Sequence, residues 1–142
     1  MKNKIVMLIE DNPDDVKLTL RAFKQNNLLN EVVVARDGAE ALQYLKNCSS
    51  RPTVILLDLK LPKVDGLEVL AFIRGDERLK RIPVIVLTSS REEQDIVASY
   101  GRGANSYIRK PVDFEQFTEA VRQLGVYWLL LNEPIPEQPR LE

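Results

Sequence analysis

The carboxylates that directly follow two apolar runs are the residues of this chain best suited to chemistry. Glu10 and Asp11 come after the apolar residues 5–9, and Asp58 follows the apolar run Val54–Leu57. Short apolar runs of this kind predict strands that are buried on both faces of a parallel sheet. Because ligands bind outside the carboxyl ends of strands in open α/β sheets, we expect the three carboxylates to converge on one crevice.

Carboxylates that share a crevice repel one another. A single pair about 4 Å apart costs roughly 4 kcal/mol at an effective dielectric constant of about 20. Either a raised pKa on one acid or a bound cation relieves this repulsion. A small site with only oxygen ligands favours Mg²⁺, which would neutralise the oxygens of an incoming phosphoryl group. These acids therefore predict a magnesium site suited to phosphoryl transfer.

Two further polar side chains stand at the ends of later apolar runs. Thr88 ends a run that begins at Pro83, and Lys110 ends the run 105–110. Taken alone, a strand-end threonine and a surface lysine are the ordinary interpretations of these residues. Beside three convergent carboxylates, however, a hydroxyl donor and an ammonium group suit an anion held in the same crevice, and their joint occurrence favours a functional site.

Alternating strand and helix patterns would position these side chains. Strands are predicted at residues 5–9, 31–35, 54–57, 83–88 and 105–110. The following helices would begin at residues that suit N-caps, namely Asn12, Asp37, Asp65, Ser90 and Asp113. Because consecutive βαβ crossovers are nearly always right-handed, this alternation predicts an α/β fold. We expect a flavodoxin-like doubly wound (βα)5 fold with a five-stranded parallel sheet in the order 2-1-3-4-5.

The first predicted helix has both a start signal and a packing face. Asn12 suits the N-cap, and Pro13 suits the first helical position. Val16, Leu20 and Phe23 then follow at the spacing of one helical face.

The composition excludes several classes of protein. A length of 142 residues predicts about one domain, and a net charge of −1 argues against a general electrostatic grip on nucleic acid. The chain has no histidine, which excludes Ser-His-Asp and Cys-His catalysis, the usual zinc sites and a phosphohistidine step within the chain. The single cysteine, Cys48, excludes an intramolecular disulfide. With no apolar run of about 18 residues and no signal-peptide pattern, we expect a cytoplasmic protein without a membrane partner.

The polar residues at the predicted strand ends resemble the active site of the receiver domain of two-component response regulators. The resemblance runs from Ile5 to about Leu124. It implies that Asp58 is the phosphoacceptor and binds Mg²⁺ directly together with Asp11. Glu10 would act on the ion mainly through water.

The same resemblance assigns roles to four more residues. Lys60 would supply a third protein ligand to Mg²⁺ through its main-chain carbonyl. Thr88 and Lys110 would each contact a phosphoryl oxygen, and Tyr107 would move inward with Thr88 as a switch. None of these positions departs from the family pattern.

The resemblance also implies a partner and an output. The phosphoryl donor would be a histidine kinase, since this chain has no histidine. The chain would not be an enzyme in the usual sense, because it would catalyse only its own phosphorylation and dephosphorylation. Its signal would be a packing change across the fourth helix, fifth strand and fifth helix. A finer resemblance is to the stand-alone regulators that partner cyanobacterial-type phytochrome kinases, at Asp37-Gly38, Ala41-Leu42, Ser99-Tyr100, Gly103-Ala104-Asn105 and Lys110–Phe114.

The C-terminal part of the chain predicts self-association. Apolar residues fall on one helical face at Phe114, Phe117, Val121, Leu124, Trp128 and Leu131. Val126, Leu129 and Leu130 lie off that face and would leave apolar surface exposed, so we expect a homodimer through the C-terminal helix region rather than a monomer. Three prolines after residue 133 mark an extended tail. The expected organisation is a receiver domain over residues 1–132 and a tail over residues 133–142.

Other classes of protein fit the pattern less well. An aspartyl phosphatase of the haloacid dehalogenase type would need a second Asp two residues after the nucleophile, where Lys60 stands. A flavodoxin-like cofactor binder would need a hydroxyl- or glycine-rich phosphate loop in place of the acidic residues 10–15. No GxxxxGK[ST] run is present for a P-loop nucleotidase. A metal-free pseudo-receiver that serves only as a protein-docking module is the non-catalytic alternative.

Overall fold

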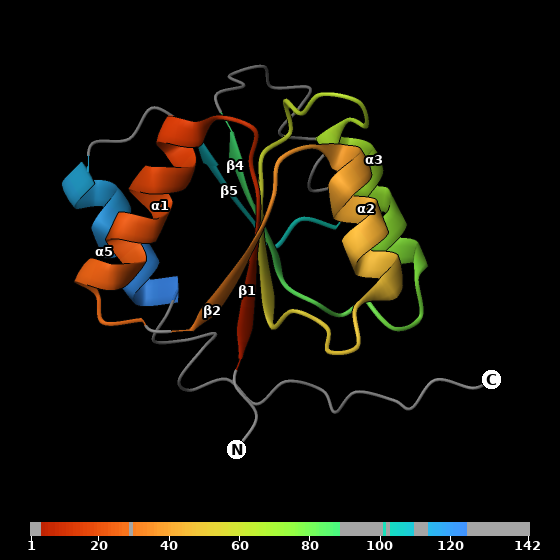
Figure 1. The fold of residues 1–142 in the computed structure, drawn as a ribbon, viewed down its shortest axis with the longest axis horizontal. Helices are drawn as coiled ribbons and strands as arrows, with labels where there is room; N and C mark the ends of the chain where they lie inside the picture. Colours follow the sequence, from red (N-terminus) through yellow and green to blue (C-terminus); the bar gives the residue numbers. More distant parts are fainter. Residues whose placement is uncertain (1–3, 29, 89–100, 102, 110–113, 125–142) are drawn as a thin grey trace.

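The computed structural model of the chain describes residues 4–28, 30–88, 101, 103–109 and 114–124. Within them, strands and helices alternate along the chain for most of its length (Figure 1). The strands are β1 (Ile5–Ile9), β2 (Glu31–Ala35), β3 (Val54–Leu57), β4 (Val84–Thr88) and β5 (Ser106–Arg109). The helices are α1 (Pro13–Gln25), α2 (Gly38–Asn47), α3 (Gly66–Gly75) and α5 (Phe114–Leu124). The helix predicted after Ser90 lies outside the described residues.

The strands form a parallel sheet in the order β2-β1-β3-β4-β5. The chain therefore reverses its direction of winding at β1, whose neighbours are β2 and β3. In the register of the central pair, Ile9 lies opposite Leu57. The predicted flavodoxin-like α/β architecture with a parallel sheet is confirmed.

Helices cover both faces of the sheet, with α1 and α5 on one face and α2 and α3 on the other (Figure 1). Alternate residues of each central strand point to opposite faces, so the sheet divides the core into two clusters. The cluster under α1 and α5 contains Val6, Leu8, Val54, Leu56, Ile85 and Leu87 from the strands. The cluster under α2 and α3 contains Met7, Ile9, Ile55, Leu57 and Val84. Continuous apolar runs are thus explained by burial on both faces.

Side-chain caps start the helices where the sequence predicts them. The side-chain Oδ1 of Asn12 accepts from the backbone N–H groups of Asp14 and Asp15 at 2.9 and 3.3 Å. Asp37 and Asp65 cap α2 and α3 in the same way. These contacts satisfy backbone donors that the first turn of a helix otherwise leaves without partners.

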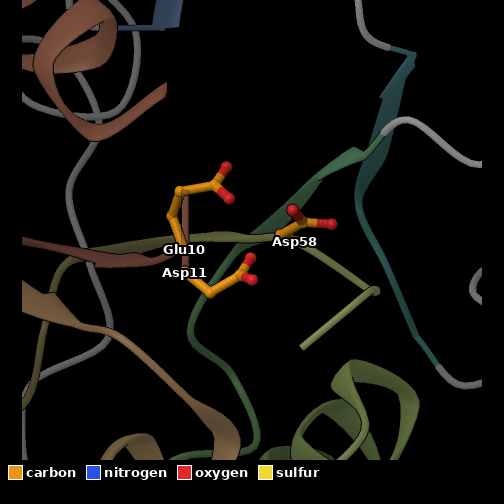
Figure 2. Close-up of side chains that lie close together, drawn as sticks. All are labelled: Glu10, Asp11 and Asp58. Atoms are coloured by element: carbon orange, nitrogen blue, oxygen red, sulfur yellow. The ribbon is translucent and has the colours of Figure 1, made fainter. Parts of the chain in front are cut away.

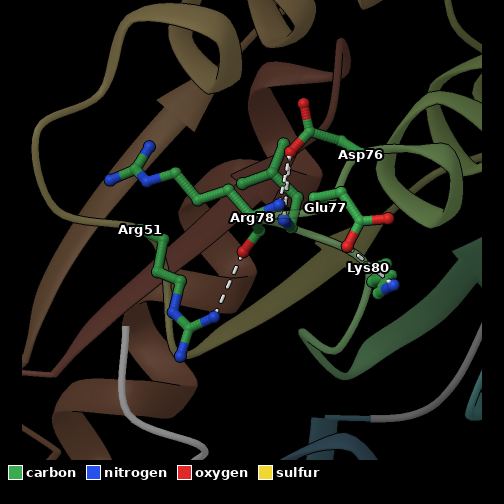
Figure 3. Close-up of polar contacts among 6 residues, drawn as sticks. Arg51, Asp76, Glu77, Arg78 and Lys80 are labelled. Atoms are coloured by element: carbon green, nitrogen blue, oxygen red, sulfur yellow. Dashed lines mark hydrogen bonds and ion pairs between the residues drawn. The ribbon is translucent and has the colours of Figure 1, made fainter. Parts of the chain in front are cut away.

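Two arginines connect the segment after α3 with the segment after α2 (Figure 3). The Arg51 guanidinium donates to the main-chain carbonyl of Arg78 at 3.1 Å. Arg78 in turn donates to the main-chain carbonyl of Cys48 at 2.8 Å, and its own backbone N–H donates to Asp76 at 2.8 Å. These bonds fix the edge of the molecule opposite the strand-end carboxylates.

Among the described helices, none combines the length and apolar character that crossing a membrane requires.

Candidate functional site

The register of β1 and β3 brings Glu10 and Asp58 together. Each residue follows the last residue of its strand, and those last residues, Ile9 and Leu57, are directly paired. The backbone N–H of Asp58 donates to the carbonyl of Ile9 at 3.0 Å, which extends the ladder by one residue. The N–H of Glu10 donates to Ala35 of β2 at 3.0 Å. Backbone pairing therefore fixes both acids at the carboxyl edge of the sheet.

Glu10, Asp11 and Asp58 converge at this edge, as predicted (Figure 2). Their carboxylate oxygens, one from each residue, all lie within 4.8 Å of one another. Glu10 and Asp58 are buried, with 2% and 6% of their surfaces exposed, whereas Asp11 is exposed. Two acids are thus held in the protein and the third faces solvent, so the group is open on one side.

Backbone N–H groups orient the two buried carboxylates. Oδ1 of Asp58 accepts from the N–H of Lys60 at 3.0 Å, and Oε2 of Glu10 accepts from the N–H of Asn12 at 3.3 Å. Both contacts come from residues just after the strand ends, so each strand supplies an acid together with the donor that orients it.

The three carboxylates suit a hard divalent cation. They offer only oxygen ligands within a span of 4.8 Å, and one of them is accessible to solvent. Mg²⁺ is bound in proteins by one or two carboxylates and keeps several waters, which this half-open arrangement allows. The residues present therefore fit a divalent metal ion.

A comparison with known protein families identifies the family of this chain. The family described as "Response regulator receiver domain" matches residues 6–122 of the chain. The chain belongs to the receiver domain family. It is 40% identical over 131 residues to the response regulator Rcp1 of Synechocystis, a match that covers 89% of each chain.

Three further matches are to a regulatory protein and to solved structures of response regulators. The probable methanogenesis regulatory protein FilR2 of Methanothrix harundinacea is 43% identical over 132 residues, covering 90% of this chain and 85% of the relative. The crystal structure of the phosphorylated cyanobacterial phytochrome response regulator RcpA superposes with a TM-score of 0.85 at 43% identity, covering 94% of this chain and 99% of the other. The Mn²⁺-bound form of Rcp1 superposes with a TM-score of 0.84 at 38% identity, with the same coverage. Receivers of this kind therefore include one that is phosphorylated and one that binds a divalent metal.

The receiver's remaining predicted residues lie on or just after β4 and β5. Thr88 ends β4, where it is paired with Arg109 of β5, and Tyr107 is paired with Val86. Their backbones thus occupy the predicted strands, while their side chains lie outside what the structure describes. Lys110 also lies outside the described residues. Its predicted role, and the side-chain roles of Thr88 and Tyr107, stay predictions.

The loop after Asp58 carries the main-chain group predicted to bind the metal. The side chain of Lys60 is exposed, while its backbone N–H faces Asp58 as described above. Gly66, the first residue of α3, donates its backbone N–H to the carbonyl of Leu59 at 3.1 Å and so closes the loop. The position of the Lys60 carbonyl therefore depends on this compact loop.

Two residues that start helices, Asn12 and Asp37, make further contacts that their sequence patterns do not specify. Asn12 was expected to cap α1, but its backbone N–H also donates to Glu10. Asp37 caps α2 and also lies 3.5 Å from the ammonium group of Lys63 in the loop after β3. The hydrogen bond from the Glu40 backbone N–H, aided by Lys63, holds the pKa of Asp37 below its ordinary value. In the sequence, only the glycine at position 38 indicates that the start of α2 contacts another segment, because a helix does not require glycine in its first turn.

Proposed function

We propose that this receiver is a single-domain response regulator that accepts a phosphoryl group on Asp58 from a partner histidine kinase. The observation that carries the proposal is the position of Asp58, a buried carboxylate directly after a central strand with two further acids beside it. The carboxylate would attack phosphorus while the bond from phosphorus to the donor nitrogen breaks. The product would be an acyl phosphate on Asp58.

Magnesium dependence is part of this proposal. Asp11, Asp58 and the main-chain carbonyl of Lys60 would hold Mg²⁺, and Glu10 would act mainly through water. When bound, the ion supplies positive charge that offsets the negative charge of the phosphoryl oxygens. The convergence of three carboxylates supports this assignment, since a cation would relieve their mutual repulsion.

The other side of the phosphoryl group would be held by Thr88 and Lys110. We expect the Thr88 hydroxyl to donate to one phosphoryl oxygen and the Lys110 ammonium group to pair with another. Movement of Thr88 would let Tyr107 turn inward and so change the packing of the fourth helix, β5 and α5. The adjacency of β4 and β5 supports a joint response. The chain would act on itself and on no separate substrate.

A histidine kinase of the phytochrome class is the proposed partner. The similarity to RcpA, a cyanobacterial phytochrome response regulator, supports this choice. FilR2 is described as a regulator of methanogenesis, so a kinase of another sensory class is the alternative. Phosphoryl transfer from a purified phytochrome kinase at a rate no higher than from an unrelated kinase would favour the alternative.

The remaining expectations belong to the same proposal. They are the complete (βα)5 arrangement, a receiver domain over residues 1–132 with a tail over residues 133–142, a homodimer through the C-terminal helix region and a cytoplasmic location. No nucleic-acid or membrane partner is proposed. The region beyond Leu124, on which the dimer and the tail depend, lies outside the described residues.

The direct test is the intact mass of the protein after incubation with Mg²⁺ and a small acyl-phosphate donor. We expect one added phosphoryl group on the wild type and none on Asp58→Asn, whose amide keeps the shape of the side chain but is a poor nucleophile. Omission of Mg²⁺ should also abolish the adduct. Equal labelling of both proteins would assign the phosphoryl group to another residue. No labelling of the wild type, together with no divalent-metal binding, would support the docking-module alternative.

A further inference from the structure

The loop between β3 and α3, residues 59–65, is closed tightly on its α3 side. The backbone of Gly66 lies so near the loop that a Cβ atom there would stand 2.5 Å from both the carbonyl oxygen of Asp58 and the Cα atom of Leu59. No side chain fits at this separation. The start of α3 thus packs directly against the backbone that leaves Asp58.

The start of α2 packs equally closely against the other side of the same loop. Gly38 is buried, and a Cβ atom on it would lie 2.0 Å from the carbonyl oxygen of Val64 and 2.6 Å from the Val64 Cβ atom. Its backbone N–H donates to the carbonyl of Pro62 at 3.3 Å. Gly38 does not have a positive φ, so glycine is needed here for space rather than for backbone conformation. Figure 1 shows α2 and α3 side by side on one face of the sheet, with the loop near their N-termini.

The apex of the loop has an unusual backbone conformation next to Asp37. Lys63 has a φ of 69°, in the left-handed region that non-glycine residues seldom adopt. Its ammonium group lies 3.5 Å from Asp37, whose other carboxylate oxygen accepts from the Glu40 backbone N–H at 2.7 Å. The residue that caps α2 therefore also contacts the apex of the loop.

We propose that the Asp37–Gly38 turn is a positioning element for the metal site, because it fixes the loop that carries the Lys60 carbonyl. This inference rests on the proposed function and assigns to the turn a role in that same site. The Pro62 carbonyl accepts from Gly38 and also from Val64, at 2.9 Å, so the turn and the loop share one acceptor two residues after Lys60. Groups that orient metal ligands from behind typically change metal affinity 10- to 100-fold when they are altered.

The first test compares two glycine-to-alanine variants of the full chain. Gly38→Ala adds a methyl group where the loop backbone already stands, whereas Gly75→Ala adds one at the end of α3, where nothing lies within 4 Å. Mn²⁺ binding would be measured by titration calorimetry, well below the thermal transition of each protein. We expect roughly tenfold weaker binding by Gly38→Ala and wild-type binding by Gly75→Ala. Wild-type affinity in a folded Gly38→Ala protein would overturn the inference.

A second pair of variants decides the question if Gly38→Ala does not fold. Lys63→Gly and Lys63→Pro both remove the ion pair with Asp37, but only proline excludes a φ of 69°. Because Lys63 is exposed, with 69% of its side-chain surface accessible, neither change disturbs the core. We expect Lys63→Pro to weaken Mn²⁺ binding severalfold relative to Lys63→Gly, and equal affinities would overturn the inference. A wild type that binds no Mn²⁺ and accepts no phosphoryl group would overturn the proposed function as well. The behaviour of the wild type therefore distinguishes failure of the proposed function from failure of the positioning role alone.

Discussion

Asp11 is the exposed member of the three carboxylates, so its charge can be removed with little disturbance of the core. In Asp11→Asn, two acids remain where three repelled one another. An exposed pair about 4 Å apart interacts by roughly 1 kcal/mol in water. We expect the metal-free variant to unfold about 3 °C above the wild type.

The same variant should respond less to a divalent ion. An ion that binds only the folded protein adds about 2.7 kcal/mol to the free energy of unfolding at 100 times its dissociation constant. Because Asp11→Asn lacks a proposed ligand, its melting temperature should rise less with Mn²⁺ than that of the wild type. Asp14→Asn, an exposed acid outside the cluster, is the matched control. An equal Mn²⁺ response in all three proteins would exclude Asp11 as a ligand.

Glu119 provides a prediction about pH on the surface of α5. Hydrogen bonds from the Arg122 guanidinium, at 2.6 and 2.9 Å, and from Gln123 lower the pKa of Glu119 from 4.5 to about 2. A carboxyl whose pKa is depressed in the folded state stabilises the fold above its unfolded pKa and loses that effect as the pH falls through the folded value. The contribution of Glu119 should therefore be complete above about pH 5 and disappear between about pH 4.5 and 2.

This pH effect can be isolated with Glu119→Gln. The difference in melting temperature between wild type and variant should be small, because both partners are exposed and water screens them. It should shrink further as the pH falls toward 2 and in 1 M salt. A difference that is constant from pH 7 to pH 2 would contradict the depressed pKa.

Among the site residues, the sequence was sufficient to predict the three carboxylates but not what holds them. Glu10, Asp11 and Asp58 converge because parallel strands end at one edge, which is a rule of topology. The contact of the Asn12 backbone with Glu10 could not be predicted, because every residue type except proline carries the same backbone N–H group. The close approach of Gly38 to Val64 depends on the separation of two helices, which no local pattern specifies.

At the scale of elements, Arg74 connects the end of α3 with the segments that precede β4 and β5. Its guanidinium donates to the main-chain carbonyls of Lys80, Ile82 and Gly103 at 3.0, 2.7 and 2.8 Å. It also donates to the side-chain carbonyl of Asn105 at 2.9 Å. Burial lowers the pKa of the Arg74 guanidinium below its ordinary value, as expected for a cation partly removed from water. One side chain thus joins three segments of the chain.

Replacement of this connection should be strongly destabilising. In Arg74→Met, several carbonyl acceptors lose a charged donor, and such losses typically cost roughly 2–4 kcal/mol in total at a partly buried site. Urea unfolding should show this loss as a lower midpoint with little change in slope. The exposed Arg81, changed to Met, is the control and should alter stability by less than about 0.5 kcal/mol. Equal midpoints for the two variants would mean that the Arg74 bonds contribute no net stability.

Helix α1 shows that a helical spacing of apolar residues predicts the presence of a helix more accurately than it predicts which residues of that helix are buried. Val16 and Phe23 are buried as their spacing suggests, but Leu20 is 39% exposed and Thr19 is buried in its place. The hydroxyl of Thr19 donates to the carbonyl of Asp15 at 2.8 Å, so its burial leaves no polar atom without a partner. The predicted packing face is therefore wrong by one position, with Thr19 buried instead of Leu20. The reason is that a threonine hydroxyl can form its hydrogen bond to a carbonyl of its own helix and so be buried at little cost.

At the scale of the whole molecule, the sheet order followed from short signals that agreed with one another. Apolar runs such as Val54–Leu57 predicted strands, and caps such as Asn12 and Asp37 predicted helices between them. With right-handed crossovers, only a few sheet orders remained. What local patterns could not supply was the long-range bonding of Arg74, whose partners Gly103 and Asn105 lie about 30 residues away in the sequence.

Self-association is a prediction about the whole molecule. Apolar residues beyond Leu124 should be covered by a second copy of the chain, because exposed apolar surface is unfavourable in water. Sedimentation at high micromolar concentration should therefore show a dimer. We expect the dimer to persist in the presence of beryllofluoride, a phosphoryl mimic. A monomer under both conditions would contradict the prediction and assign the apolar residues to packing within one chain.

The bonding of Arg74 has a consequence for the evolution of the family. Three of its four acceptors are main-chain carbonyls, which every amino acid carries. Residue 80 can therefore diverge between relatives without loss of its bond, whereas Ile82 is constrained by its burial in the core and residue 105 must keep a carbonyl-bearing side chain. Position 103 tolerates less change, because its φ of 95° favours glycine and a Cβ atom there would lie 2.7 Å from the Arg74 side chain. Relatives that retain the arginine should thus vary freely at 80, keep an apolar residue at 82 and retain glycine at 103.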